Sequence, residues 1–202
     1  MANQQQTISY TLHGNAYLNL TNRCTLRCQF CPKFNKQWEV QGYPLRLTDE
    51  PDVKTVLKAL GDVSQYKEVV FCGLGEPTLC LDNLLEISTT LKKQGARIRV
   101  NTDGLGNLIH DYDVTPYFAD KIDALSISLN AQNEVVYNKH CRPQHDNAYP
   151  AVLDFVRCAR KHVPDITLTA IDGLEGVDID ACNKIAQQLK VSFRRRILDE
   201  VG

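Results

Sequence analysis

The chain has 202 residues, of which 43% are hydrophobic and 23% charged, and its formal net charge is −1 at pH 7. This length allows one domain with a substantial core, and the balanced charge excludes a chain that binds nucleic acid or anionic membranes through a bulk basic field. The polar start lacks the features of a signal peptide, and no stretch is long and apolar enough to cross a membrane. We therefore expect a cytoplasmic protein whose eight cysteines serve metal or redox chemistry and not disulfides.

Hydrophobic periodicity predicts strands and helices that alternate along most of the chain. A polar tail, a short strand at 8–12 and a turn at 13–15 occupy residues 1–15. Further strands are predicted at 17–21, 68–72, 97–101, 124–130, 166–171 and 191–198. Helices are predicted at 50–60, with Thr48 as the candidate cap, and at 84–95, 115–119, 149–162 and 179–189. Residues 32–47 are predicted to be irregular. Six strands that alternate with five helices indicate a parallel α/β protein, and we treat residues 1–202 as a single domain.

The composition of the strands favours a barrel over a flat sheet. Strands of a doubly wound sheet are apolar throughout, because helices cover both of their faces. Here polar and apolar residues alternate, as where Ile98 and Val100 alternate with Arg97, Arg99 and Asn101. Side chains alternate across a strand, so one face would lie under helices and the other would line a polar lumen. We expect a partial (β/α)6 barrel similar to a TIM barrel, since eight strands need a longer chain. An antiparallel sheet with one solvated face is the alternative, and the helical segments between the strands argue against it.

Three cysteines, Cys24, Cys28 and Cys31, lie within the eight residues 24–31, which we call the cysteine loop. Their C-x3-C-x2-C spacing differs from the paired C-x2-C spacing of common zinc sites. Three thiolates are one fewer than a zinc site or an ordinary iron–sulfur cluster uses, so a cubane cluster held here would keep one iron without a protein ligand. The loop follows the strand at 17–21, and active sites of such barrels lie at the carboxyl ends of the strands.

A glycine-rich segment, GLGEP at residues 73–77, follows the next long strand. Glycine lets backbone carbonyl groups approach a ligand closely, and Glu76 would either offset a positive charge on that ligand or fix the loop. The same five residues by themselves would also suit a plain turn. Their position one βα unit after the cysteine loop favours a shared site.

The cysteine motif, with Phe30 just before its third cysteine, resembles the signature of the radical SAM superfamily. The resemblance implies that Cys24, Cys28 and Cys31 hold a [4Fe-4S] cluster, whose fourth iron binds the amino and carboxylate groups of S-adenosylmethionine. The GLGEP segment resembles the GGEP motif of the superfamily, which holds the methionyl amine of that cofactor. The residues that the resemblance places at the cofactor are Phe30, Gly73, Gly75, Glu76, Thr102, Ser128 and Asn130. Turns or caps are the alternative roles of the last three.

Two neighbouring positions fit the resemblance less well. Asp103 stands where the T-N-G segment of the superfamily has Asn, so its contact is not implied. Ile171, at the end of the strand at 166–171, would lie against the adenine, although ordinary core packing is favoured for it.

The resemblance also implies a function. The reduced cluster would donate an electron to S-adenosylmethionine, which cleaves to methionine and a 5′-deoxyadenosyl radical that abstracts hydrogen from a substrate in the lumen. Such an enzyme is oxygen-sensitive and needs an external low-potential electron donor, and no catalytic group is assigned beyond the cluster ligands. Its substrate would be a small molecule or a peptide, and a glycyl-radical-type activase acting on a protein partner is one alternative.

A finer pattern, HGNxYLNLTNRC at residues 13–24, resembles the TatD-associated radical SAM subgroup. This implies an association with a TatD-type hydrolase and specifies no substrate. The sequence leaves the reductant and the oligomeric state open as well.

Two other classes of function remain open from the sequence. An iron–sulfur electron-transfer module without cofactor cleavage would need a fourth permanent ligand, for which Cys72 and Cys141 are the plausible sources. Packing is the favoured role of Cys72, and Cys80, Cys158 and Cys182 are predicted to be core thiols. A zinc-stabilised structural or nucleic-acid-binding domain is disfavoured by the near-neutral charge and by the GLGEP segment.

Two further groups of residues carry weaker signals. His140, Cys141 and His145 are predicted to lie in a solvated loop after the strand at 124–130, with contact to substrate as the alternative. Arg194 and Arg196 would point into the lumen from the last strand. There they would pair with an anionic substrate or with structural carboxylates such as that of Glu68, and the structural pairing is favoured.

Overall fold

A seven-stranded sheet organises the protein, and the computed structural model describes it within residues 6–34 and 37–198. Its strands are β1 (Ser9–Leu12), β2 (Asn15–Leu18), β5 (Val69–Phe71), β6 (Ile98–Thr102), β7 (Ala124–Ser128), β8 (Asp165–Asp172) and β9 (Ser192–Ile197). Their order in space is the same as their order in the chain. Strands β2 to β9 of this sheet pair in parallel, and β1 pairs antiparallel with β2 at the edge. The prediction of six parallel strands is confirmed, while most of the polar tail, residues 1–5, lies outside the described residues.

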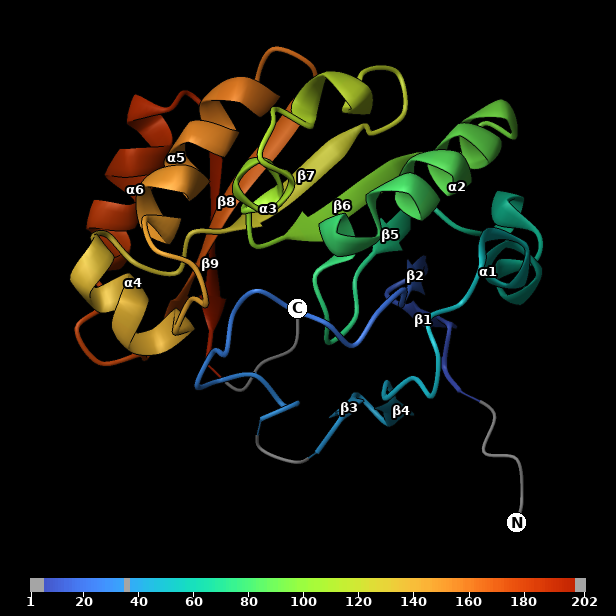
Figure 1. Cartoon of the computed structure of the whole chain (residues 1–202), viewed down its shortest axis with the longest axis horizontal. Helices are drawn as coiled ribbons and strands as arrows, with labels where there is room; N and C mark the ends of the chain where they lie inside the picture. Colours follow the sequence, from blue (N-terminus) through green and yellow to red (C-terminus); the bar gives the residue numbers. More distant parts are fainter. Residues whose placement is uncertain (1–5, 35–36, 199–202) are drawn as a thin grey trace.

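In the described part of the chain, six α-helices connect or flank these strands (Figure 1). They are α1 (Val53–Leu60), α2 (Leu81–Lys93), α3 (Gly106–His110), α4 (Glu134–Cys141), α5 (Ala148–Ala159) and α6 (Ile179–Gln188). The helix predicted at 115–119 is a 3-10 helix, η3 (Thr115–Phe118). The predicted cap of α1 was wrong, because Asp52 and not Thr48 accepts the hydrogen bond from the Thr55 amide, at 2.7 Å.

Two helices, α3 and α4, were not predicted. Helix α3 has five residues, too few for a hydrophobic period to appear. Helix α4 lacks a clear apolar stripe, since Val135 is 80% exposed on its surface. Its start is set by Asn133, whose side chain accepts from the Val136 amide at 3.0 Å. Because no apolar stripe follows this capping residue, the sequence did not indicate a helix here.

The two faces of the sheet differ as predicted. One face carries buried apolar residues that pack against α2, α5 and α6, among them Ile98, Val100, Leu125, Ile127, Ile166 and Leu168. The opposite face carries Arg99, Asn101, Ser126, Ser128, Thr167 and Thr169. Ile171 shares this second face and is one of the buried hydrophobic residues, as its predicted packing requires, although it belongs to neither apolar cluster of the described residues. The lumen is polar with a few apolar positions.

The early part of the chain forms two short hairpins. The predicted strand at 17–21 is shifted toward the N-terminus in β2, and the chain has left the sheet by Asn19. Residues 32–47, predicted to be irregular, contain β3 (Glu39–Val40) and β4 (Tyr43–Pro44) around a turn with Gly42 at φ 82°. Glycine suits this left-handed conformation, which a two-residue hairpin requires.

All eight cysteines of the chain are free thiols. Those outside the cysteine loop occupy varied surroundings. Cys182 is buried in the main core and Cys80 packs at its edge, as predicted. Cys158 belongs to neither apolar cluster of the described residues, so its predicted core role is wrong. Within the described residues, no helix is both long and apolar enough to span a bilayer.

Candidate functional site

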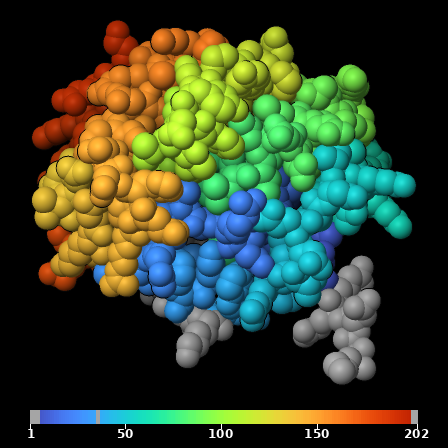
Figure 2. All heavy atoms as spheres, viewed as in Figure 1, coloured from blue at the N-terminus to red at the C-terminus, as the bar shows by residue number. Residues whose placement is uncertain are grey.

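The cysteine loop leaves the sheet after β2 and lies against the C-terminal end of α4 (Figure 1). The Arg27 amide donates to the carbonyl of Cys141 at 3.0 Å, and the Gln29 amide to the carbonyl of His140 at 2.9 Å. In the space-filling view, the blue early segment and the yellow to orange atoms of this region are in contact (Figure 2). Residues 140–144 therefore hold the loop in place through backbone hydrogen bonds.

This arrangement corrects an expectation about His140, Cys141 and His145, which were predicted to lie in a solvated loop. His140 and Cys141 form the last turn of α4 and are only 3% and 0% exposed. The Nε2 atom of His140 lies 2.8 Å from the carbonyl oxygen of Glu175. Of the three, His145 alone is exposed. The prediction failed because α4 itself was missed.

The three cysteines of the loop lie at the boundary between two apolar clusters. Cys24 and Cys28 pack against the main core, and Cys31 packs against a smaller cluster that contains Leu74. Burial raises the pKa of Cys24 to about 12 and also raises that of Cys31. The pKa of Cys28 is also raised. The largest cause is a hydrogen bond with the thiol of Cys141, and burial is the second. Metal binding here would therefore release protons from the thiols.

The donor set of the loop suits a cluster better than a single ion. In the described part of the chain, no three Cys, His, Asp or Glu side chains converge closely enough to hold one metal ion. A zinc ion needs every thiolate within about 2.3 Å of the same centre. In a [4Fe-4S] cluster each thiolate binds a different iron, so the ligands stand further apart. The three thiols of the loop are of the soft type that such a cluster binds.

Glu76 joins the ends of β5 and β6 beneath this loop. It is 3% exposed, and its Oε1 accepts from the Thr78 amide at 3.0 Å and from the hydroxyls of Thr78 and Thr102 at 2.8 and 2.7 Å. Its Oε2 accepts from the Asp103 amide at 2.7 Å. Of the two roles considered for Glu76, these contacts support fixing the loop. The Thr102 hydroxyl also accepts from the Gly104 amide, so it is engaged within the protein.

Asp103 is a second buried carboxyl group beside Glu76. One oxygen accepts from the Leu105 amide at 3.0 Å, and the other is hydrogen-bonded to the hydroxyl of Thr25, next to Cys24. Burial, with the negative charge of Glu76 as the next cause, raises the pKa of Asp103 well above its ordinary value of 3.8. The pair thus connects the cysteine loop to the ends of two strands, and Asp103 favours its protonated form.

The raised pKa of Asp103 leads to a prediction about stability. Between pH 3.8 and the raised pKa, the folded protein keeps a proton that the unfolded chain releases, so stability falls as pH rises through this window. The change Asp103→Asn removes the acid and keeps its shape. We expect the variant to gain stability relative to wild type as pH rises above 3.8, by at most about 1.4 kcal/mol per pH unit, with no further gain once the pH exceeds the raised pKa.

Thermal unfolding midpoints across that pH range would measure the effect. Asp146→Asn, at an exposed aspartate, is the matched control and should follow wild type at every pH. Parallel curves for Asp103→Asn and wild type would contradict the prediction.

Gly73 and Gly75 allow the GLGEP segment to pack against the chain that leads from β2 to the cysteine loop. A Cβ atom on Gly73 would lie 2.1 Å from Oδ1 of Asn19, and one on Gly75 would lie 2.1 Å from the carbonyl oxygen of Thr21. Any larger residue would force the two segments apart. The glycines therefore place Glu76 and the cysteine loop side by side, a reason the sequence did not reveal.

The remaining predicted cofactor residues lie near the same end of the sheet. Phe30 is half-buried against the main core, and Ser128 is the last residue of β7, on its lumen face. Asn130 is 1% exposed and has a left-handed φ of 59°. Its Nδ2 donates to Sγ of Cys141 at 3.6 Å, so it reaches the segment that holds the loop.

The favoured pairing of Arg194 and Arg196 with Glu68 is wrong. Glu68 instead accepts from Arg97 and Arg99, at 3.2 and 2.7 Å. Nη2 of Arg196 donates to Oδ1 of Asn130 at 3.1 Å. Sequence reasoning missed this contact because it depends on the turn after β7, which no local pattern specifies.

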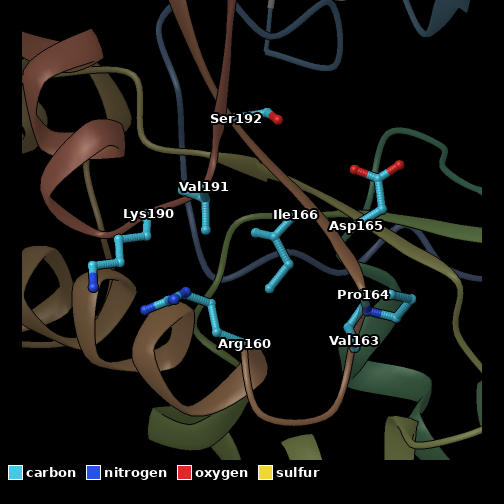
Figure 3. Close-up of a pocket in the computed structure, with 8 residues that line it drawn as sticks. All are labelled: Arg160, Val163, Pro164, Asp165, Ile166, Lys190, Val191 and Ser192. Carbon is cyan, nitrogen blue, oxygen red and sulfur yellow. The ribbon is translucent and has the colours of Figure 1, made fainter.

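A surface pocket of about 450 Å³ lies at the other end of the sheet (Figure 3). Its lining is Arg160, Val163, Pro164, Asp165, Ile166, Lys190, Val191 and Ser192, from the turns that lead into β8 and β9. These are the amino ends of the strands, whereas the cysteine loop, GLGEP and Asn130 follow carboxyl ends. Barrels of this type place their chemistry at carboxyl ends, so the pocket is no part of the candidate site.

Comparisons with known proteins agree with this arrangement. A family model described as the radical SAM superfamily matches residues 18–189. Over 91 residues the chain is 32% identical to the tungsten-containing aldehyde ferredoxin oxidoreductase cofactor-modifying protein of Pyrococcus furiosus, an alignment that covers 44% of this chain and 23% of that protein. Over 129 residues it is 31% identical to the dual-specificity RNA methyltransferase RlmN of Buchnera aphidicola subsp. Schizaphis graminum, covering 57% and 32%. The chain thus aligns with about a quarter to a third of each curated relative.

Among solved structures, TYW1 with a lysine-pyruvate adduct bound is similar, with a TM-score of 0.64 and 16% identity. The match covers 94% of this chain and 66% of that one. At this identity the likeness shows the fold alone. It agrees with the predicted partial barrel, in which a mostly parallel sheet presents the site at one end.

Proposed function

Because the chain belongs to the radical SAM superfamily, we propose that it is an enzyme that cleaves S-adenosylmethionine reductively and removes a hydrogen atom from a substrate. The observation that carries the proposal is the cysteine loop, whose three thiols lie beside the Glu76 loop at the carboxyl ends of the parallel strands. When bound, a [4Fe-4S] cluster and S-adenosylmethionine supply the 5′-deoxyadenosyl radical chemistry of this superfamily. An external low-potential electron donor would reduce the cluster.

We propose that Cys24, Cys28 and Cys31 hold the cluster. The residues proposed to surround the cofactor are Phe30, Gly73, Gly75, Glu76, Thr102, Ser128 and Asn130. Among them, Glu76 and Thr102 act by fixing the loop, because their polar atoms bond to each other and to neighbouring backbone groups. The buried residues His140 and Cys141, packed against the cysteine loop, would help to keep water and oxygen from the radical.

The test of this proposal is anaerobic. The protein is reconstituted with iron and sulfide, reduced with dithionite and assayed for 5′-deoxyadenosine from S-adenosylmethionine. We expect product, and a change in the cluster spectrum at one iron when the cofactor is added. Zinc without iron in anaerobically purified protein, together with no product, would refute the proposal and favour a structural zinc domain.

A second candidate function is an electron-transfer module whose cluster has a fourth permanent cysteine. The contact between Cys141 and Cys28 favours Cys141 over Cys72 as that ligand, because the thiol of Cys72 is hydrogen-bonded to Asn101 instead. An enzyme of the superfamily needs that coordination position free for its cofactor.

The change Cys141→Ser separates the two candidates. For the proposed enzyme we expect the cluster to form with unchanged iron content and to keep its spectral response to S-adenosylmethionine. For the electron-transfer module, the variant should lose the cluster or one of its irons. Iron analysis and electron paramagnetic resonance make the measurement, and Cys182→Ser, in the core away from the loop, controls for general effects of losing a buried thiol.

We also propose membership of the TatD-associated subgroup, which the segment at residues 13–24 supports. In this proposal the whole chain is one radical SAM core domain in the cytoplasm, and a TatD-type hydrolase is its partner. Size-exclusion chromatography of the two purified chains, mixed anaerobically, would test the association. Separate elution at micromolar concentrations would argue against a stable complex.

A further inference from the structure

We propose that the lumen end of β9 binds an anionic group of the substrate, a carboxylate or a phosphate, through Arg196 with Arg194 beside it. The inference deepens the proposed function and rests on it for the word substrate. The anion site itself rests on the contacts of Arg196 and on the position of Arg194 two residues away on the same face of β9, and neither the family match nor the similar proteins assign it.

Arg196 presents a mostly buried guanidinium group with spare donors. Its Nη2 atom donates to Oδ1 of Asn130, whereas its Nε is fully buried and has no hydrogen-bond partner. Neither Arg196 nor Arg194 forms an ion pair with a carboxylate in the described part of the chain. Burial, with the charge of Arg194 as the next cause, lowers the pKa of Arg196. A buried cation beside a second cation is costly unless an anion joins them.

The other arginines of the sheet show how this protein normally treats such charges. Arg97 and Arg99 share the carboxylate of Glu68, and Arg195 pairs with Asp172 on the face of β9 opposite to Arg196. Each of these three arginines contacts a carboxylate, even those whose side chains are far more exposed than that of Arg196. The missing carboxylate therefore distinguishes Arg196, and Arg194 beside it, from the other three arginines.

The position of Arg196 connects it to the candidate site. Asn130, which accepts its hydrogen bond, also contacts Cys141, and Cys141 contacts Cys28 of the cysteine loop. Arg196 is in register with Ile171, the buried apolar residue of the lumen. An anion held here would lie on the lumen face, close to where the radical would form. The planar fork of a guanidinium group suits a carboxylate or a phosphate.

Inorganic phosphate is the probe for the anion site. Thermal unfolding of the purified protein is followed in increasing sodium phosphate, against sodium chloride at equal ionic strength. We expect a phosphate-specific rise of the midpoint in wild type and in Arg195→Gln, which changes the opposite face of the same strand. Arg196→Gln should lose that rise, and Arg196→Lys, which keeps the charge without the fork, should show a reduced one. Equal responses of wild type and both Arg196 variants would overturn the site.

A second measurement tests whether the anion that binds here belongs to the substrate or to the cofactor. S-adenosylmethionine is titrated into reconstituted wild-type protein at low and high phosphate, with chloride matching the ionic strength. We expect the dissociation constant to change by less than about twofold. A dissociation constant that rises in proportion to phosphate would assign the site to the carboxylate of the cofactor and overturn the inference. If no S-adenosylmethionine binds at all, the proposed function fails, while the phosphate result still decides whether an anion site exists.

Discussion

Replacing Cys24 by alanine should reduce 5′-deoxyadenosine formation to background, a fall of more than about 100-fold. Residues that merely orient a metal ligand already cost about 10- to 100-fold when changed, and Cys24 is proposed as a ligand itself. The alanine variant keeps only two thiols on the cysteine loop. Two thiolates do not retain a cubane cluster. Iron and sulfide content after anaerobic reconstitution should fall together with the product.

Cys158→Ala is the matched control for this variant, because Cys158 lies on α5, away from the cysteine loop and outside both apolar clusters of the described residues. It should keep the iron content and product yield of wild type. Product from Cys24→Ala at the wild-type rate would refute the proposed function, whatever the control does.

Replacing Glu76 by alanine should lower the free energy of unfolding by about 2–4 kcal/mol. The carboxylate accepts four hydrogen bonds in a site that is 3% exposed, from Thr78, Thr102 and the Asp103 amide. Each buried donor left without an acceptor costs about 1–3 kcal/mol. The loss is partly offset, because burial and then the charge of Glu76 raise the pKa of Asp103, and without Glu76 the second of these causes is gone.

Urea unfolding followed by circular dichroism measures this effect, with Glu134→Ala as the control. Glu134 is exposed in the first turn of α4 and should change stability by no more than about 0.5 kcal/mol. If Glu76→Ala unfolded at the same urea concentration as wild type, the prediction that Glu76 fixes the loop would be wrong. Glu76→Gln should fall between the two, because its amide nitrogen cannot accept from the donors it would face.

Much of the fold could be predicted because its signals are local. The alternation of Ile98 and Val100 with charged neighbours reflects the two faces of a single strand, and it indicated the polar lumen directly. The cysteine loop and the GLGEP segment were visible for the same reason, since each lies within a few consecutive residues. Helix α4 was missed because its buried residues, Tyr137, His140 and Cys141, form no continuous apolar stripe.

The partners of the site residues could not be predicted, since they come from distant parts of the chain. Glu76 meets Asp103 only because β5 and β6 are neighbours, and Arg196 meets Asn130 only after a left-handed turn follows β7. Strand alternation pointed Arg196 into the lumen, where a carboxylate such as that of Glu68 was expected to pair with it, whereas the structure pairs Glu68 with Arg97 and Arg99. Pairing of this kind is a property of the topology.

The hydrogen bonds between the cysteine loop and residues 140–144 also determine when the loop can become ordered. The side-chain amide of Gln144 donates to the carbonyl of Cys24 at 2.8 Å across 120 positions of sequence. Contacts so distant along the chain close late, because their loop entropy is offset only after the intervening strands have paired. The hydrogen bonds of Arg27 and Gln29 therefore form only after α4 has folded. A cluster that needs this part of the loop fixed in place would accordingly bind late in folding, after α4 has formed.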